Sequence, residues 1–249
     1  MLHHYPIGAG GIFLETNPNL STIQTDSTNP SSPNHSIAYS QNIQFFSEQQ
    51  QVTQLITHHL DEVLDVMNQL NLDKETADFR DPTWKGAASE FTWLPTYMIK
   101  LGGSERVNGG EALKKCVAKN GSNLIVIPEQ RCFYIPETHH QKTNLRELCV
   151  AKKIEGIQGR EIKINLQQAR QLVTLIIETG ISDLKWRNLV YCNDGTIALI
   201  DTECFLGAYY GLRSLLEKNS FDDDARKFVV EEIDAMRLRK MQKKSQMVF

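Results

Sequence analysis

Residues 166–203 constrain the fold of this chain more strongly than any other stretch. Apolar residues recur here at steps of three and four and are followed by Gly180, which predicts a helix over 166–179. Two β-rich runs, 189–192 and 196–200, come next, and the Asn193-Asp194-Gly195 sequence between them is a strong hairpin signal. The pattern predicts a mixed α+β domain in which the loop 181–188 lies beside the end of a hairpin. The apolar helix positions are Leu166, Ala169, Leu172, Val173, Ile176 and Ile177.

Four polar residues converge in this arrangement. Asp183, Lys185 and Asn188 share the loop after the helix, and Asp201 ends the hairpin that folds back beside it. A carboxylate and an amide oxygen are hard ligands that suit Mg²⁺, with phosphate oxygens and water completing the shell, so Asp201 and Asn188 are the candidate metal ligands. Asp183 can orient a substrate hydroxyl and accept its proton, while Lys185 can neutralise charge on a phosphoryl group in transfer.

This segment resembles the catalytic loop and metal-binding strand end of the protein-kinase-like superfamily. Residues 181–188, Ile-Ser-Asp-Leu-Lys-Trp-Arg-Asn, are similar to the loop pattern H-R-D-L-x-x-x-N, and Asp201-Thr202-Glu203 is similar to D-F-G. The resemblance implies a two-lobed kinase-like fold that binds ATP and Mg²⁺. Asp183 then takes the base position, Lys185 the phosphate-contacting position, and Asn188 and Asp201 the two metal positions. Ile181 and Ser182 replace the family's His-Arg pair, so the loop has no arginine at the position that receives an activation-loop phosphate.

The upstream order agrees with this resemblance. Tyr97-Met98-Ile99-Lys100 is similar to the V-A-I-K strand, which implies that Lys100 reaches the α and β phosphates. Its partner glutamate should come from the following helix, with Glu111 as the first choice and Glu105 as the second. Residues 148–154 followed by Glu155-Gly156 resemble the strand and hinge whose backbone meets adenine. The glycine-rich phosphate loop is missing, and residues 85–89, Lys-Gly-Ala-Ala-Ser, are the only candidate for its place.

Two functions follow from the resemblance. The first is a kinase-like enzyme that transfers phosphate from ATP to a hydroxyl acceptor, either a protein or a small molecule. Asp201 is followed by only 48 of the 249 residues, so the carboxyl-terminal lobe is shortened, as in the small kinases of lipopolysaccharide-core sugars or of restricted protein partners. The second is a catalytically dead pseudokinase that serves as a protein-interaction module or bacterial effector.

Composition excludes several other classes of protein. The 27 Lys and Arg residues against 30 Asp and Glu give a net charge of -3, which argues against a dedicated nucleic-acid-binding protein. Five cysteines, odd in number and widely spread, favour reduced thiols in a reducing compartment. No stretch predicts a secretory signal or a membrane span, so we expect a cytoplasmic protein. The polar amino terminus, which lacks Lys and Arg, also resembles the leader of effectors exported without a cleaved signal.

The chain is expected to divide into four regions: a disordered tail at 1–45, an amphipathic helix at 46–75, an N-lobe at 76–155 and a C-lobe at 156–249. The apolar stripe of the helix runs from Val52 to Leu70 and must face either its own domain or a protein partner. Further predicted elements are a strand at 91–101 interrupted near Pro95, a helix at 111–119, a hairpin joining 124–127 to 132–135, and helices at 209–218 and 223–243.

Overall fold

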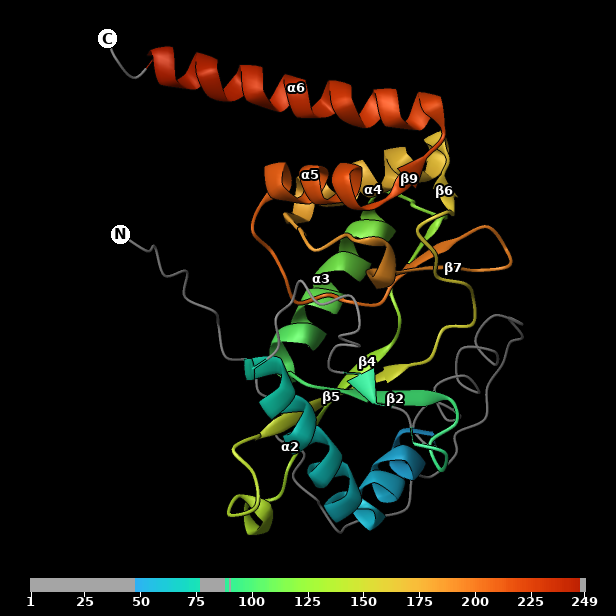
Figure 1. Cartoon of the computed structure of the whole chain (residues 1–249), viewed down its shortest axis with the longest axis vertical. Coiled ribbons are helices and arrows are strands. Elements are labelled where there is room, and N and C mark those ends of the chain that lie inside the picture. Colours follow the sequence, from blue (N-terminus) through green and yellow to red (C-terminus); the bar gives the residue numbers. More distant parts are fainter. Residues whose placement is uncertain (1–47, 77–87, 90, 247–249) are drawn as a thin grey trace, which may run out of the picture. The chain divides into compact units, whose positions relative to one another are not determined.

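A computed structural model describes residues 48–76, 88–89 and 91–246, and these residues form the α+β architecture that the sequence predicts. Figure 1 shows the succession of helices and strands along the chain. The predicted tail at 1–45 and most of the candidate phosphate loop at 85–89 lie outside the described residues. All described residues from 48 onward belong to one compact unit that contains two hydrophobic cores.

The first core is built on a four-stranded antiparallel sheet. Its strands are β1 (Ala88–Ser89), β2 (Tyr97–Lys100), β5 (Glu147–Lys152) and β4 (Gln130–Tyr134), in the order β1-β2-β5-β4. The strand predicted at 91–101 is shorter than expected, because residues 91–96 form turns before β2 and Pro95 has no N–H to donate to a ladder. A short 3₁₀ helix, η1 (Glu137–His139), lies in the connection from β4 to β5.

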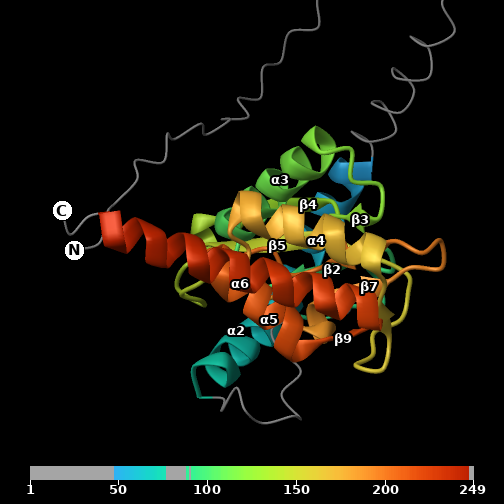
Figure 2. The same cartoon turned by 90° about the horizontal axis from the view of Figure 1, so that it is seen from above.

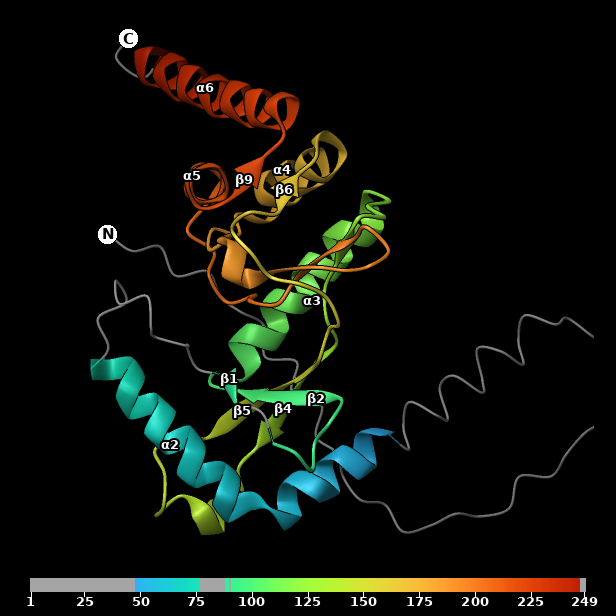
Figure 3. The ribbon, with the colours of Figure 1, turned by 45° about the vertical axis from the view of Figure 1, so that its right-hand side comes forward.

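One face of this sheet is covered by the amino-terminal helices. Residues 48–58 are helical, the helix is interrupted at His59, and α2 (Leu60–Thr76) continues the predicted stripe. Figure 3 shows α2 beside the sheet. The apolar stripe is buried against the sheet, so the alternative in which it faces a protein partner is wrong for its central residues. The buried members from the two helices are Ile56, Leu60, Val63, Leu64 and Met67, and they pack with Ile99, Leu148 and Val150 among others.

The predicted hairpin between 124–127 and 132–135 is wrong. The first run forms β3 (Ile125–Val126), which pairs in parallel with β8 (Ile197–Leu199) of a different sheet, whereas the second run belongs to β4 and pairs with β5. Pro128 lies between the two strands, and their true partners come from segments far along the chain. Local turn signals carry no information about such distant partners.

Helix α3 (Ser104–Lys119) connects the two cores. It begins seven residues before the predicted helix. The prediction missed its first half because Gly109 and Gly110 are weak helix formers. The helix contacts β4 and β5 of the first sheet and also β3 and α4 (Leu166–Thr179). Figures 1 and 3 show α3 running from the sheet toward α4. Its first half therefore lies at the sheet, and its Leu113 and Cys116 enter the second core.

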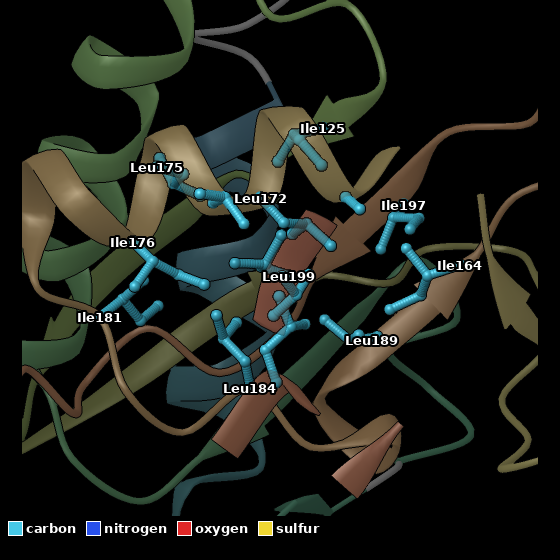
Figure 4. Close-up of a cluster of buried hydrophobic side chains, with 14 of the residues drawn as sticks. Ile125, Ile164, Leu172, Leu175, Ile176, Ile181, Leu184, Leu189, Ile197 and Leu199 are labelled. Carbon is cyan, nitrogen blue, oxygen red and sulfur yellow. The ribbon is translucent and has the colours of Figure 1, made fainter. Parts of the chain in front are cut away.

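The second core surrounds α4, whose predicted bounds are confirmed. Asn165 and Gln168 form a capping box at its start, and Gly180 ends it in the left-handed conformation with φ 77°. The predicted hairpin is also confirmed as β7 (Leu189–Tyr191) paired with β8. Figure 4 shows leucine and isoleucine side chains of α4 and of the hairpin meeting in this core, among them Leu172, Ile176, Leu189, Ile197 and Leu199.

Two carboxyl-terminal helices complete the second core. They are α5 (Ala208–Lys218) and α6 (Asp223–Gln246), and both pack on α4. Figure 2 shows α6 running across α4 and α5. A two-stranded parallel sheet of β6 (Lys163–Ile164) and β9 (Ser220–Phe221) joins the starts of α4 and α6. In the described part of the chain, no helix combines the length and apolar character needed to cross a bilayer.

Candidate functional site

The loop 181–188 is anchored by its buried apolar residues, which leaves the charged side chains of Asp183 and Lys185 half-buried outside the core. Ile181 and Leu184 are buried in the second core, with 1% and 0% of their surface exposed. Asn219, at the end of α5, donates a hydrogen bond of 2.7 Å to the Leu184 carbonyl. Asp183 and Lys185 flank Leu184, and their charged groups form an ion pair of 2.8 Å. Because alternate residues of an extended loop point to opposite sides, burial of Leu184 turns both charged neighbours away from the core.

Asn188 joins this loop to the hairpin. It ends the 3₁₀ helix η2 (Trp186–Asn188), and its side-chain Nδ2 donates to both the Asp183 backbone oxygen at 2.9 Å and the Asp183 carboxylate at 3.0 Å. Its own backbone oxygen accepts a hydrogen bond of 3.0 Å from the N–H of Ile200. The structure therefore brings Asp183, Asn188 and the backbone of Ile200, the residue before Asp201, together.

Asp201 is held by a residue that the sequence reasoning missed. Arg106, in the first turn of α3, places Nη1 at 2.7 Å from the Asp201 carboxylate and Nη2 at 2.7 Å from the Glu203 carboxylate. Its Nε donates to the Leu101 carbonyl at 3.3 Å. Only 6% of the Arg106 side chain is exposed, against 25% for Asp201 and 31% for Glu203. A buried arginine thus neutralises the candidate metal ligand.

Lys100 reaches the same segment from the first sheet. Its Nζ donates a hydrogen bond to the backbone carbonyl of Ile200, and 6% of the residue is exposed. Burial and the nearby Arg106 cation lower the pKa of Lys100 to about 8, because both disfavour a second positive charge. The carboxylates of Asp201 and Glu203 act in the opposite direction. Lys100 therefore contacts the residue that precedes Asp201 in the chain.

The partner predicted for Lys100 lies elsewhere. Glu111 is half-exposed and forms an ion pair of 2.9 Å with Lys114 on the same helix, while Glu105 is exposed. The described contacts bring neither glutamate to Lys100, and Arg106 lies on α3 at the position facing the site. One signal for Arg106 was present in the sequence, since its spacing to Gly109, Gly110 and Leu113 matches the buried face of a helix.

A cavity of about 570 Å³ opens beside Lys100. It is lined by residues of β2 and β5, by the segment that follows β5, and by Val190 and Ile200 at the open end of the hairpin. Apolar residues of both the sheet and the hairpin line it, together with Lys100. Representative lining residues are Met98, Lys100, Ala151, Ile154, Val190 and Ile200.

The segment after β5 offers unused backbone groups to this cavity. The N–H groups of Lys152 and Lys153 donate to Glu129 and Thr96, respectively, at 2.8 and 2.9 Å. Beyond them the chain leaves the sheet, and no hydrogen bond within the described residues engages the backbone groups of Ile154 or Glu155. Backbone donors and acceptors that lie at a cavity and lack internal partners are available to a ligand.

The donor set suits a metal that keeps several non-protein ligands. Among the described residues, no group of three or more His, Cys, Asp or Glu side chains could hold a metal ion. Asp201 and the side-chain oxygen of Asn188 are hard oxygen donors of the kind that Mg²⁺ prefers. The Asp201 carboxylate is paired with Arg106, and the Asn188 amide nitrogen is used by Asp183.

Comparisons with protein-family models, with curated proteins and with solved structures returned no match to this chain.

Proposed function

We propose that this chain is a kinase-like protein that binds ATP and Mg²⁺ in the cavity beside Lys100 and transfers the γ-phosphoryl group to a hydroxyl acceptor. One observation carries the proposal. The buried Lys100 of the first sheet meets the Ile200 backbone, directly before Asp201, while Asn188 joins that backbone to Asp183. Hydrogen bonds thus link Lys100, which lines the cavity, through Ile200 and Asn188 to Asp183, and these residues follow the order of the kinase-like pattern.

The proposal includes a two-lobed arrangement. The sheet β1-β2-β5-β4 with the amino-terminal helices forms the first lobe, and the core around α4 forms the second. The presence of two separate hydrophobic cores supports this division, as does the position of the cavity between residues of the sheet and residues of the hairpin. Cavities between lobes are common sites for nucleotides and other small ligands.

The adenine base would lie between the apolar side chains of the cavity. Met98 and Ala151 belong to the sheet, and Val190 belongs to the hairpin. The free backbone groups of Ile154 and Glu155 can donate to and accept from the edge of the base. A planar base that stacks on apolar side chains and pairs with backbone groups satisfies both the apolar and the polar parts of this cavity.

The chemistry falls to the loop residues. Asp183 would orient the acceptor hydroxyl, whose oxygen forms a bond to the γ-phosphorus as the bond from that phosphorus to the bridging β–γ oxygen breaks. The hydroxyl proton passes to Asp183, and ADP leaves. Lys185, paired with Asp183 at 2.8 Å, lies close enough to neutralise charge on the transferring group. Mg²⁺ held by Asn188 and Asp201 would neutralise phosphate charge.

A second function is favoured by one specific observation. Arg106 pairs with Asp201 and Glu203, and Thr202-Glu203 stands where the kinase-like pattern has Phe-Gly. A protein whose metal ligand stays paired with arginine would bind nucleotide weakly or without Mg²⁺. Such a protein would act as a pseudokinase, either as a protein-interaction module or as an effector.

The test is nucleotide binding by wild type and two site variants. ATP with Mg²⁺ should raise the midpoint of thermal unfolding, and ligand at 100 times its dissociation constant adds about 2.7 kcal/mol to the free energy of unfolding. Asp201→Ala should lose the Mg²⁺-dependent part of this shift. Asp183→Ala should keep the shift but lose transfer of ³²P from labelled ATP.

Lys114→Gln is the matched control, because it removes an exposed cation from α3 outside the cavity. Its shift and its transfer should equal those of wild type. Absence of any shift in wild type at millimolar ATP would refute nucleotide binding. A shift without transfer to any hydroxyl acceptor, identical in wild type and Asp183→Ala, would favour the pseudokinase.

A further inference from the structure

The guanidinium of Arg106 lies beside the Asp201 carboxylate, where the proposed function places Mg²⁺. Two of its nitrogens each contact a different carboxylate, Asp201 and Glu203, and both separations are 2.7 Å. Charge-assisted bonds of this length are among the strongest polar contacts in proteins. In the described structure, therefore, the Arg106 guanidinium supplies the positive charge beside Asp201.

Arg106 is held at the site by more than its two ion pairs. Its side chain is 6% exposed, and its Nε is also bonded to the Leu101 carbonyl. The backbone at Arg106 is fixed as well, because its carbonyl accepts a hydrogen bond of 2.8 Å from the buried hydroxyl of Thr202. A buried guanidinium that loses every anionic partner carries a large desolvation cost, so any exchange must leave Arg106 with one carboxylate.

Glu203 can provide that remaining carboxylate. It contacts a different guanidinium nitrogen from Asp201, so the bond to Glu203 survives when the bond to Asp201 breaks. Gly102 has φ 83°, a conformation that favours glycine, and it lies beside this pair: a Cβ there would be 3.3 Å from the Glu203 carboxylate.

We infer that Arg106 is an exchangeable counter-ion for Asp201: Mg²⁺ arriving with ATP competes with the guanidinium for the Asp201 carboxylate, and Glu203 keeps Arg106 paired after the exchange. This inference rests on the proposed function, since it describes how Mg²⁺ enters the same site. The pair holds Asp201 in a state that does not bind metal. The apparent dissociation constant for Mg²⁺ is therefore the intrinsic constant divided by the fraction of molecules in which Asp201 is released.

The experiment measures how much Mg²⁺ is needed for nucleotide binding. The probe is the β,γ-imido analogue of ATP, which is not hydrolysed, titrated calorimetrically at a series of Mg²⁺ concentrations. Arg106→Lys keeps the positive charge, but the lysine ammonium lacks the planar set of N–H donors with which the guanidinium binds two carboxylates at once. We expect it to lower the half-saturating Mg²⁺ concentration about fivefold to tenfold, which corresponds to about 1 to 1.4 kcal/mol. Arg106→Gln should lower it at least as much.

Glu203→Gln should change the Mg²⁺ requirement in the opposite direction. Without the Glu203 carboxylate, release of Asp201 would leave Arg106 unpaired and buried, so the half-saturating concentration should rise about tenfold. In the double variant Arg106→Lys/Glu203→Gln, the change in the half-saturating Mg²⁺ concentration, expressed as a free energy, should differ from the sum of the two single changes. Lys114→Gln, which removes an exposed cation from the same helix, should match wild type.

The outcomes separate the inference from the proposed function. Binding of the analogue by all variants with one common Mg²⁺ requirement overturns the exchange and leaves the nucleotide site in place. A lower half-saturating Mg²⁺ concentration for Arg106→Gln but not for Arg106→Lys also overturns the exchange, because the loss of a positive charge alone then explains the data. If wild type and all variants fail to bind the analogue at any Mg²⁺ concentration, the proposed function fails and the exchange fails with it. Circular dichroism checks that each variant is folded. If Arg106→Gln is unfolded, the test uses Arg106→Lys.

Discussion

The hydroxyl of Thr202 donates a hydrogen bond of 2.8 Å to the backbone carbonyl oxygen of Arg106. Thr202 is fully buried, and the bond ties the segment that carries Asp201 to the first turn of α3. The Gln130 amide oxygen, from β4, lies 3.1 Å from the same hydroxyl. Because one hydroxyl has a single proton, it serves one of these acceptors at a time. Sheet, helix and candidate metal ligand therefore meet at Thr202, where the kinase-like pattern has phenylalanine.

Gly109→Ala should destabilise the fold even though alanine is the better helix former. A Cβ at Gly109 would lie 1.9 Å from the Thr202 carbonyl oxygen, far closer than two non-bonded atoms can approach. Helix α3 and the Asp201 segment would therefore have to separate. We expect a loss of at least about 2 kcal/mol in the free energy of unfolding, measured by urea denaturation.

Gly110→Ala is the control for this prediction. Its Cβ would lie 3.1 Å from the flexible Gln130 side chain, which can shift, and alanine gains about 1 kcal/mol of helix propensity. The variant should be within about 1 kcal/mol of wild type. Equal stability of the two variants would show that α3 does not approach Thr202 closely in solution.

Lys100 should make the stability of the protein depend on pH in the alkaline range. Its pKa is lowered from 10.5 to about 8 in the folded state, so between these values the unfolded chain binds more protons than the folded one. The stability of wild type relative to Lys100→Met should therefore increase as pH rises through about 8, by up to about 1.4 kcal/mol per pH unit. Urea denaturation of both proteins at about pH 7 and about pH 9.5 measures the difference. A constant difference across this range would exclude a buried, perturbed lysine.

Met67→Ala tests whether the amino-terminal stripe belongs to the domain core. Met67 is fully buried against the sheet, so its truncation should cost about 2 to 5 kcal/mol in the free energy of unfolding. Leu72, on the same helix, is 56% exposed, and Leu72→Ala should cost less than about 1 kcal/mol. Equally small losses for both variants would mean that α2 does not pack on the sheet, and the stripe would again be available to a partner.

The elements that were predicted correctly are those specified by neighbouring residues. Helix α4 matches its predicted bounds because its apolar spacing, its capping box and Gly180 all lie within the segment itself. The hairpin of β7 and β8 is specified in the same way by Asn193-Asp194-Gly195. The convergence of Asp183, Asn188 and the residue before Asp201 followed from these two elements, since a helix and a hairpin in sequence leave little freedom to the loop between them.

The errors concern contacts between segments far apart in the chain. The run 124–127 was expected to pair with the next strand, but β3 instead joins β8 about seventy residues later, a choice made by the second core. Glu111 was expected to meet Lys100, yet the residue that enters the site is Arg106, because the start of α3 and its rotation depend on how closely Gly109 lets it approach Thr202.

The sequence by itself determined the α+β composition, the helix and hairpin around the polar loop, and the polar residues that this loop carries. Hydrogen-bonding capacity and apolar periodicity are local properties, so they can be read without coordinates. Only the tertiary structure decided which charge faces Asp201. Pairing of buried charges depends on the separation and burial of groups from different segments, and here packing places the Arg106 guanidinium, 95 residues away in the chain, at 2.7 Å from that carboxylate.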